Sequence, residues 1–121
     1  MILLFNLVIS SYNCKNVKSS TCEIKSICDT CDVLFLQETW LTSQELPFLA
    51  SLHPEFYSRG ISSIDSSDGI LVGRPYGGLA ILWRKSLGNF INVRSMDDDR
   101  LLLLEVKNCD TQISLLNIYL Q

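Results

Sequence analysis

The sequence lacks an apolar run long enough to cross a bilayer. The longest run, Met1–Ile9, is interrupted by Asn6 and falls well short of the roughly 20 residues that a membrane helix needs. The segment also lacks the basic start of a signal peptide, and Ser10 to Tyr12 make a poor cleavage site. We therefore expect no membrane partner and an intracellular chain, in the nucleus or the cytoplasm, that is not secreted. Leu3–Ser11 is expected to be a buried strand.

An excess of basic residues is also missing. Lysine and arginine number 10 against 13 aspartates and glutamates, which gives a net charge of -3. Affinity for nucleic acid comes largely from neutralisation of phosphates by basic side chains. The composition thus excludes a general attraction to nucleic acid, and any such function must depend on a local site.

Histidine is nearly absent, with His53 alone, and the five cysteines are odd in number and scattered. This count does not indicate a disulfide framework. Cys28 and Cys31 have the C-x-x-C spacing that zinc or redox chemistry uses, but no second ligand pair lies nearby in the sequence. Free thiols in a reducing compartment are the favoured interpretation. A redox or zinc protein that uses Cys28 and Cys31 stays an alternative.

What the sequence does contain is enough apolar material for a core. The 121 residues are 47% hydrophobic and 19% charged, which suits one ordinary domain and not two. The expected order is strand, helix, strand, helix and then mainly strands, which indicates the α/β class. The elements expected after the first strand are a helix opened by Ser20 or Thr21 and ending before Asp32, a buried strand at 33–37, a helix opening at Thr42 or Ser43 and stopped by Pro54, strands at 56–59, 77–83 and 90–94, and a hairpin of 100–107 and 112–120.

Two stretches are expected to be loops. Gly60–Tyr76 is rich in serine, aspartate and glycine and is typical of a long surface loop. Asp97–Asp99 can be imagined as a metal cluster, but a solvated turn is the better interpretation. His53, in a helix-like stretch before Pro54, is expected to be structural.

The last residue, Gln121, follows directly after an apolar strand. The apolar faces of about six strands normally need a second layer, and two short helices supply little of one. We therefore expect residues 1–121 to be a single partial domain that is truncated after about six strands.

Two polar residues follow buried strands. Glu38 comes directly after Val33–Gln37, and Asn13 stands at the corresponding end of the first strand. Ligand-binding groups in open α/β sheets lie at the carboxyl ends of strands, and Mg²⁺ often uses one or two carboxylates with water and phosphate. Taken alone, Glu38 is more often a solvated carboxylate and Asn13 a turn residue.

Four motifs in order carry a family resemblance: SYN at 11–13, LQETW at 36–40, GGLAI at 77–81 and NIY at 117–119. Together they resemble the endonuclease/exonuclease/phosphatase superfamily across nearly the whole chain. The longer string GRPYGGLAILWRK at 73–85 is similar to the endonuclease domains of non-LTR (LINE-class) retrotransposons, which indicates a transposon-derived open reading frame.

The resemblance implies half of a four-layer α/β-sandwich of the DNase I-like type. It also implies that Asn13 orients water and the metal shell, that Glu38 binds the metal, and that Tyr119 contacts the scissile phosphate. The implied reaction is hydrolysis of a phosphodiester with Mg²⁺ or Mn²⁺. DNA is the favoured substrate, while RNA and phosphorylated lipids or nucleotides stay open.

The sequence departs from the family pattern after Tyr119. The GDFN-type and SDH-type segments, which supply further aspartates, an asparagine and a histidine, are absent. Because catalytic groups act as a unit, we expect weak metal binding and no useful DNA cleavage by these residues alone. The alternative is a non-catalytic binding or interaction module that associates with itself or a partner through an uncovered sheet.

Overall fold

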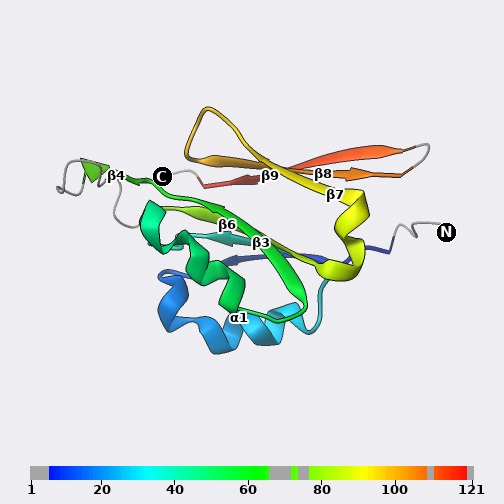
Figure 1. Ribbon diagram of the computed structural model, residues 1–121, viewed down its shortest axis with the longest axis horizontal. Coiled ribbons are helices and arrows are strands. Elements are labelled where there is room, and N and C mark those ends of the chain that lie inside the picture. The colour runs from blue at the N-terminus through cyan, green and yellow to red at the C-terminus, as the bar shows by residue number, and fades with distance from the viewer. Residues whose placement is uncertain (1–5, 66–71, 74–76, 109–110, 120–121) are drawn as a thin grey trace.

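The computed structural model describes residues 6–65, 72–73, 77–108 and 111–119. Its elements form three layers: helices, a four-stranded sheet and a three-stranded sheet (Figure 1). The α/β class is therefore confirmed. The elements are β1 (Ile9–Asn13), η1 (Val17–Ser19), α1 (Thr21–Cys28), β2 (Val33–Gln37), η2 (Ser43–Ser51), β3 (Phe56–Ile61), β4 (Ile64–Asp65), β5 (Val72–Gly73), β6 (Leu79–Arg84), η3 (Lys85–Phe90), β7 (Ile91–Ser95), β8 (Leu101–Lys107) and β9 (Gln112–Ile118), where η marks a 3₁₀ helix.

The larger sheet has the strand order β1-β2-β6-β3. β1 and β2 are parallel and joined through α1, while β6 runs antiparallel to both β2 and β3. The smaller sheet, β7-β8-β9, is an antiparallel meander. β4 and β5 form a separate short pair.

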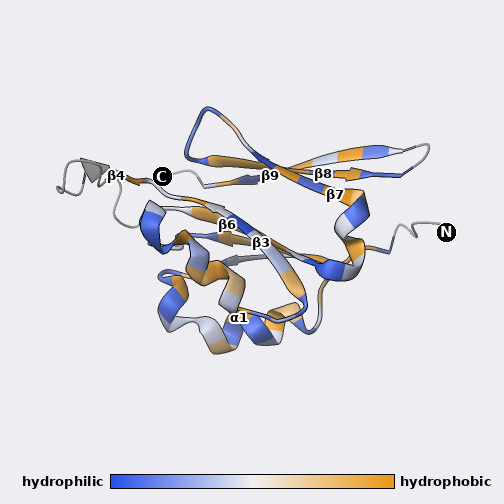
Figure 2. Cartoon of the chain, viewed as in Figure 1, coloured by the Kyte–Doolittle hydropathy of each residue, from blue (hydrophilic) through white to orange (hydrophobic). Residues whose placement is uncertain are grey.

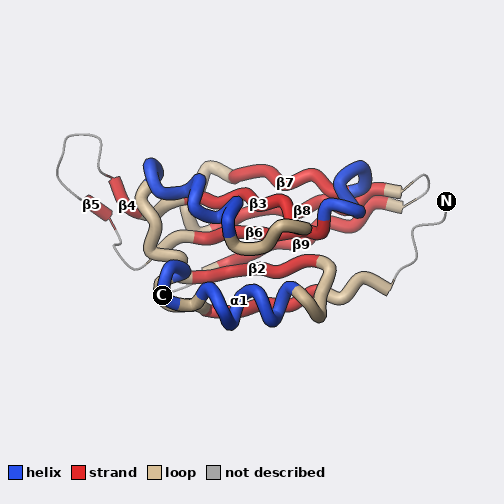
Figure 3. The backbone as a smooth tube through the Cα atoms, turned by 60° about the horizontal axis from the view of Figure 1, so that its bottom comes forward, coloured by secondary structure: helices blue, strands red, loops and turns tan. Residues whose placement is uncertain are grey.

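Alternation along the central strand β2 creates two cores. Leu34 and Leu36 pack with Ile24 and Cys28 of α1, whereas Val33 and Phe35 pack on the smaller sheet. Figure 3 shows α1 running along the sheet beside β2. Hydrophobic residues follow the strands of both sheets, while the β7–β8 connection is largely hydrophilic (Figure 2). β2 is thus buried on both faces, as predicted from its continuous apolar run.

The prediction for the first strand is confirmed only in part, because a strand is present but its start and its burial were mispredicted. β1 begins only at Ile9, whose side chain is 40% exposed, and the described residues 6–8 lie outside any strand. Met1–Phe5 lie outside the described residues. β1 is an edge strand with β2 as its neighbour in the sheet, so only part of its surface is covered and the apolar run does not place it in the core.

Other predictions are confirmed in outline. α1 buries Ile24 and Cys28 as its apolar spacing predicts, and it ends at Cys28 rather than at Asp32. The second expected helix is η2, a 3₁₀ helix with Pro47 inside it. The hairpin of β8 and β9 is also present.

The prediction of a loop at 60–76 was wrong where the structure describes it, because β3 continues to Ile61 and β4 pairs with β5. Residues 66–71 and 74–76 lie outside the described residues. Within the described part of the chain, every helix is too short or too polar to span a membrane.

Candidate active site

Several chain ends meet at one edge of the larger sheet. β1 and β2 run parallel in a register that places Asn13 beside Gln37, so both strands finish at the same level. β6 starts there, because Leu79 also pairs with Gln37. Asn13 and Glu38 therefore emerge side by side, as expected for groups at the carboxyl ends of parallel strands.

Asn13 and Glu38 are in direct contact. The Asn13 side-chain amide Nδ2 donates a hydrogen bond to Glu38 Oε2 at 2.5 Å. Glu38 is buried, at 9% exposure, and has a positive φ of 58°. A left-handed backbone is uncommon for a residue other than glycine and concentrates at functional sites. We call this pair the candidate metal site.

Backbone hydrogen bonds hold Glu38 and the next two residues from both sides. On one side, Asn16 N–H donates to Glu38 O at 2.9 Å and Val17 N–H donates to Thr39 O at 3.1 Å. On the other, Thr39 N–H donates to Gly78 O at 3.2 Å. These bonds stabilise the left-handed backbone at Glu38 and so fix where its carboxylate points.

Gly78 allows this close approach. Its φ is +102°, and a Cβ at this position would lie 2.4 Å from Thr39 Oγ1. Thr39 is fully buried, which leaves its side chain little room to move. The second glycine of the GG motif is thus required by both its backbone conformation and its neighbour.

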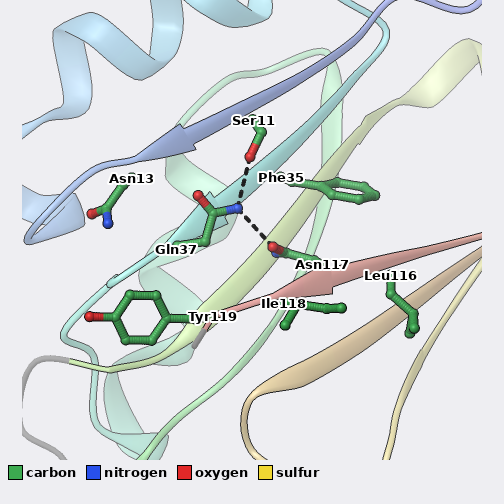
Figure 4. Close-up of a pocket in the computed structure, with 8 residues that line it drawn as sticks. All are labelled: Ser11, Asn13, Phe35, Gln37, Leu116, Asn117, Ile118 and Tyr119. Carbon is green, nitrogen blue, oxygen red and sulfur yellow. Dashed lines mark hydrogen bonds between the residues drawn. The ribbon is translucent and has the colours of Figure 1, made fainter. Parts of the chain in front are cut away.

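Tyr119 lies in the same region. It follows β9, and its backbone N–H donates to Arg100 O at 3.2 Å. Tyr119 and Asn13 both line a pocket of about 500 Å³ between the two sheets. Figure 4 shows the Tyr119 ring and the Asn13 side chain on the same side of Gln37. The structure therefore links the three residues that the resemblance singled out through Asn13, which bonds Glu38 and lines the same pocket as Tyr119, 106 positions away in the sequence.

The floor of this pocket contains a polar network that sequence reasoning missed. Gln37 Nε2 donates to Ser11 Oγ at 3.0 Å and to Asn117 Oδ1 at 2.8 Å (Figure 4). Asn117 Nδ2 donates in turn to the main-chain oxygens of Leu36 at 3.0 Å and Ala80 at 2.8 Å. The signal in the sequence was that Ser11, Gln37 and Asn117 all stand inside the motifs that carry the family resemblance, where no role was assigned to them.

The donor set fits a hard divalent cation. Glu38 offers a carboxylate and Asn13 a side-chain amide oxygen, and both are oxygen ligands of the kind that Mg²⁺ and Mn²⁺ take. A single carboxylate supplies only one negative charge to a divalent cation. Among the described residues, no group of three or more histidines, cysteines, aspartates or glutamates could hold a metal ion.

Three of the cysteines lie in the core and not at this pocket, whereas Cys22 on α1 is an exposed free thiol. Cys14, Cys28 and Cys31 are buried free thiols. Burial raises the pKa of Cys14 and of Cys28 to about 12, and it raises the pKa of Cys31 as well. Burial thus disfavours the thiolate, which is the nucleophilic form of cysteine. Cys109 lies outside the described residues.

His53 is held on both ring nitrogens. Glu55 N–H donates to Nδ1 at 3.1 Å, which leaves Nε2 to donate to Asp29 Oδ1 at 2.9 Å. Asp97–Asp99 lie in the connection from β7 to β8, where Arg100 N–H donates to Asp98 Oδ1 at 2.9 Å. Both stretches have local structural roles, and neither lines the pocket that holds Asn13 and Tyr119.

Comparison with protein families gives one match. Residues 10–119 match the Endonuclease/Exonuclease/phosphatase family. All the residues of the candidate metal site and the polar network fall inside that range. Comparison with curated protein sequences gave no match.

Solved structures share the fold. The AP endonuclease LMAP from Leishmania major has a TM-score of 0.65 at 17% identity over 93% of this chain. The 3′ phosphatase NExo from Neisseria, bound to a product DNA hairpin, has a TM-score of 0.64 at 15% identity over 93%. The APE2 catalytic domain from Xenopus laevis has a TM-score of 0.60 at 17% identity over 93%. This chain spans 39%, 41% and 45% of those chains, respectively.

Proposed function

Because the chain belongs to the Endonuclease/Exonuclease/phosphatase family, we propose that it supplies one side of a metal-dependent phosphodiesterase site that acts on DNA. The observation that carries this proposal is the convergence of Asn13, Glu38 and Tyr119 at one edge of the sheets. The DNA hairpin bound to the Neisseria phosphatase, which has a similar fold, supports DNA as the substrate class.

In this proposal each residue has a separate task. A bound Mg²⁺ or Mn²⁺ supplies charge neutralisation at the phosphodiester. Glu38 holds the ion through a carboxylate oxygen, and Asn13 fixes the orientation of that carboxylate through its hydrogen bond. Tyr119 contacts the scissile phosphate from the smaller sheet, and its hydroxyl is a suitable hydrogen-bond donor.

Metal affinity tests the assignment of Glu38. We expect the chain to bind Mn²⁺ weakly, with a dissociation constant in the millimolar range, because one carboxylate and one amide provide little charge. Glu38→Gln should abolish this binding, and Asn13→Ala should weaken it by about tenfold through loss of the hydrogen bond that orients Glu38. Electron paramagnetic resonance of free Mn²⁺ measures both effects. Glu23→Gln, an exposed carboxylate on α1, is the matched control.

We further propose that these 121 residues alone do not cleave DNA at a useful rate. The same preparations, incubated with Mg²⁺ and supercoiled plasmid, should show no nicking above that of a buffer blank. Nicking that disappears in Glu38→Gln would contradict the proposed inactivity and support the enzymatic assignment. Equal Mn²⁺ affinity in the wild type, Glu38→Gln and Glu23→Gln would overturn the metal assignment itself.

The finer family assignment is also a proposal. The string at 73–85, of which residues 74–76 lie outside the described residues, supports descent from a non-LTR retrotransposon endonuclease. The genomic sequence downstream of Gln121 tests this origin. A continuing frame with GDFN-type and SDH-type segments and a reverse transcriptase would support it, and an unrelated neighbouring gene would count against it.

A specific observation favours a second function as an interaction module. β9 is an edge strand, and its Ile113, Leu116 and Ile118 are each more than 40% exposed. Exposed apolar edges favour association. We expect sedimentation velocity to show a dimer at high micromolar concentration, and Leu116→Lys with Ile118→Lys to shift it to monomer. A wild-type chain that stays monomeric throughout the concentration series would refute this alternative.

A further inference from the structure

The three strands that carry the candidate site residues each carry a second polar residue close by. Ser11 precedes Asn13 by two positions on β1, and Asn117 precedes Tyr119 by two positions on β9. Residues two apart on a strand lie on the same face. Gln37, at the end of β2, comes directly before Glu38 and faces the smaller sheet with Phe35.

Gln37 joins these strands through one side-chain amide. Its Nε2 donates to Ser11 Oγ within the larger sheet and to Asn117 Oδ1 across the gap between the sheets. Asn117, which is only 1% exposed, uses its own Nδ2 to bond the main-chain oxygens of Leu36 and Ala80. Three hydrogen bonds thus tie one residue of β9 to the two central strands of the larger sheet.

The other contacts between the two sheets fix the position of β9 less sharply than these hydrogen bonds do. It consists of aliphatic and aromatic side chains, among them Val33, Ile81 and Leu104, and apolar packing is not directional. A shift of β9 by one residue would turn Asn117 away from the larger sheet. A shift by two residues, about 7 Å along the strand, would bring Leu115 or Tyr119 against the main-chain oxygens that Asn117 now bonds.

We propose that Gln37 and Asn117 act together as positioning residues for Tyr119, because their hydrogen bonds fix β9 against the larger sheet beside the candidate metal site. This inference rests on the proposed function. Tyr119 directly follows β9, so the position of Asn117 determines where the tyrosine ring stands relative to Glu38. The hydrogen bonds offset the desolvation cost of the buried Asn117 and the half-buried Gln37, and their directionality specifies a single register.

Gln37→Met tests the inference, since methionine has a similar length and no donor. In NMR spectra of the metal-free chain, the Tyr119 ring resonances should shift and broaden. Added Mn²⁺ should broaden the Tyr119 ring resonances in the wild type, and Gln37→Met should lose most of that broadening while keeping its Mn²⁺ affinity. Gln112→Met is the matched control, because Gln112 lies on β9, the strand that leads to Tyr119, and its side chain bonds only Glu105 in the described structure. Its Tyr119 resonances should match the wild type.

Two outcomes would overturn the inference. If Gln37→Met lowers the stability of the chain but leaves the Tyr119 resonances as in the wild type, the network is merely structural. Hydrogen exchange of the wild-type side-chain amides provides the second test and needs no variant. If the amide protons of Gln37 and Asn117 exchange as fast as those of the exposed Asn89, the hydrogen bonds do not persist. Mn²⁺ that fails to broaden Tyr119 in any chain would instead refute the proposed metal site, while the metal-free spectra still decide the positioning role.

Discussion

Gly78→Ala is expected to destabilise the chain by about 3 kcal/mol, because strain at a left-handed position adds to a steric clash. The φ of +102° is one that alanine rarely adopts, and the new Cβ would lie 2.4 Å from Thr39 Oγ1. Relief requires movement of Thr39, which directly follows Glu38. We therefore expect the same substitution to weaken Mn²⁺ binding. Urea unfolding followed by circular dichroism measures the first effect, and Mn²⁺ titration measures the second.

Gly88→Ala provides the control for Gly78→Ala. Its φ is not in the left-handed range, and the nearest atom to a new Cβ is Tyr57 Cε2 at 3.1 Å. Tyr57 is exposed, so its ring has room to shift. We expect a change of less than about 1 kcal/mol in the free energy of unfolding. Equal urea midpoints for the two variants would contradict the conformational role assigned to Gly78.

The local elements could be predicted because their signals are local. Val33–Gln37 is a short apolar run, and such a run is typical of a strand buried on both faces, as β2 is. The face of α1 followed from the spacing of Ile24 and Cys28. The hairpin of β8 and β9 followed from two apolar runs around a polar turn.

The polar network could not be predicted, because its partners are far apart in sequence. Gln37 and Asn117 are 80 positions apart, and nothing in a single sequence says that their strands lie opposite one another in two sheets. Burial of β1 was mispredicted for a different reason. The apolar run ends where β1 begins, so the strand is mostly polar and contains only Ile9 of that run, and β1 is also an edge strand.

The grouping of the site residues lies between these cases. The sequence placed Asn13 and Glu38 at corresponding strand ends, but their direct contact depends on the parallel pairing of β1 with β2, which only the structure shows. That Tyr119 would join them came only from the family resemblance, since it depends on how the smaller sheet packs on the larger one. The left-handed backbone at Glu38 had no signal of its own. Its nearest sign was the glycine pair 39 positions later, whose second member makes room for Thr39.

Arg84→Met is expected to destabilise the chain by about 2–3 kcal/mol, because it removes two charge-assisted hydrogen bonds and a ring contact. Arg84 Nη2 donates to Cys28 O at 2.9 Å and to Cys31 O at 2.7 Å, and its guanidinium lies 4.7 Å from the centre of the Phe56 ring. A cation at a helix C-terminus also interacts favourably with the helix dipole. This one side chain thus fastens the end of α1 to β6.

The matched control is Arg94→Met, whose guanidinium is 58% exposed and pairs with Glu105 at 3.2 Å. Arg94 itself lies largely in solvent. The buried Glu105 keeps hydrogen bonds from Asn92 and Gln112, so this change should cost less than about 1 kcal/mol. Thermal unfolding at several salt concentrations separates the two, because salt screens the solvent-exposed guanidinium of Arg94 more than the half-buried contacts of Arg84. If both variants lose the same stability, Arg84 is a surface charge only. If Arg84→Met alone is costly, the hydrogen bonds from Arg84 to the main-chain oxygens of Cys28 and Cys31 help to hold the C-x-x-C segment against β6.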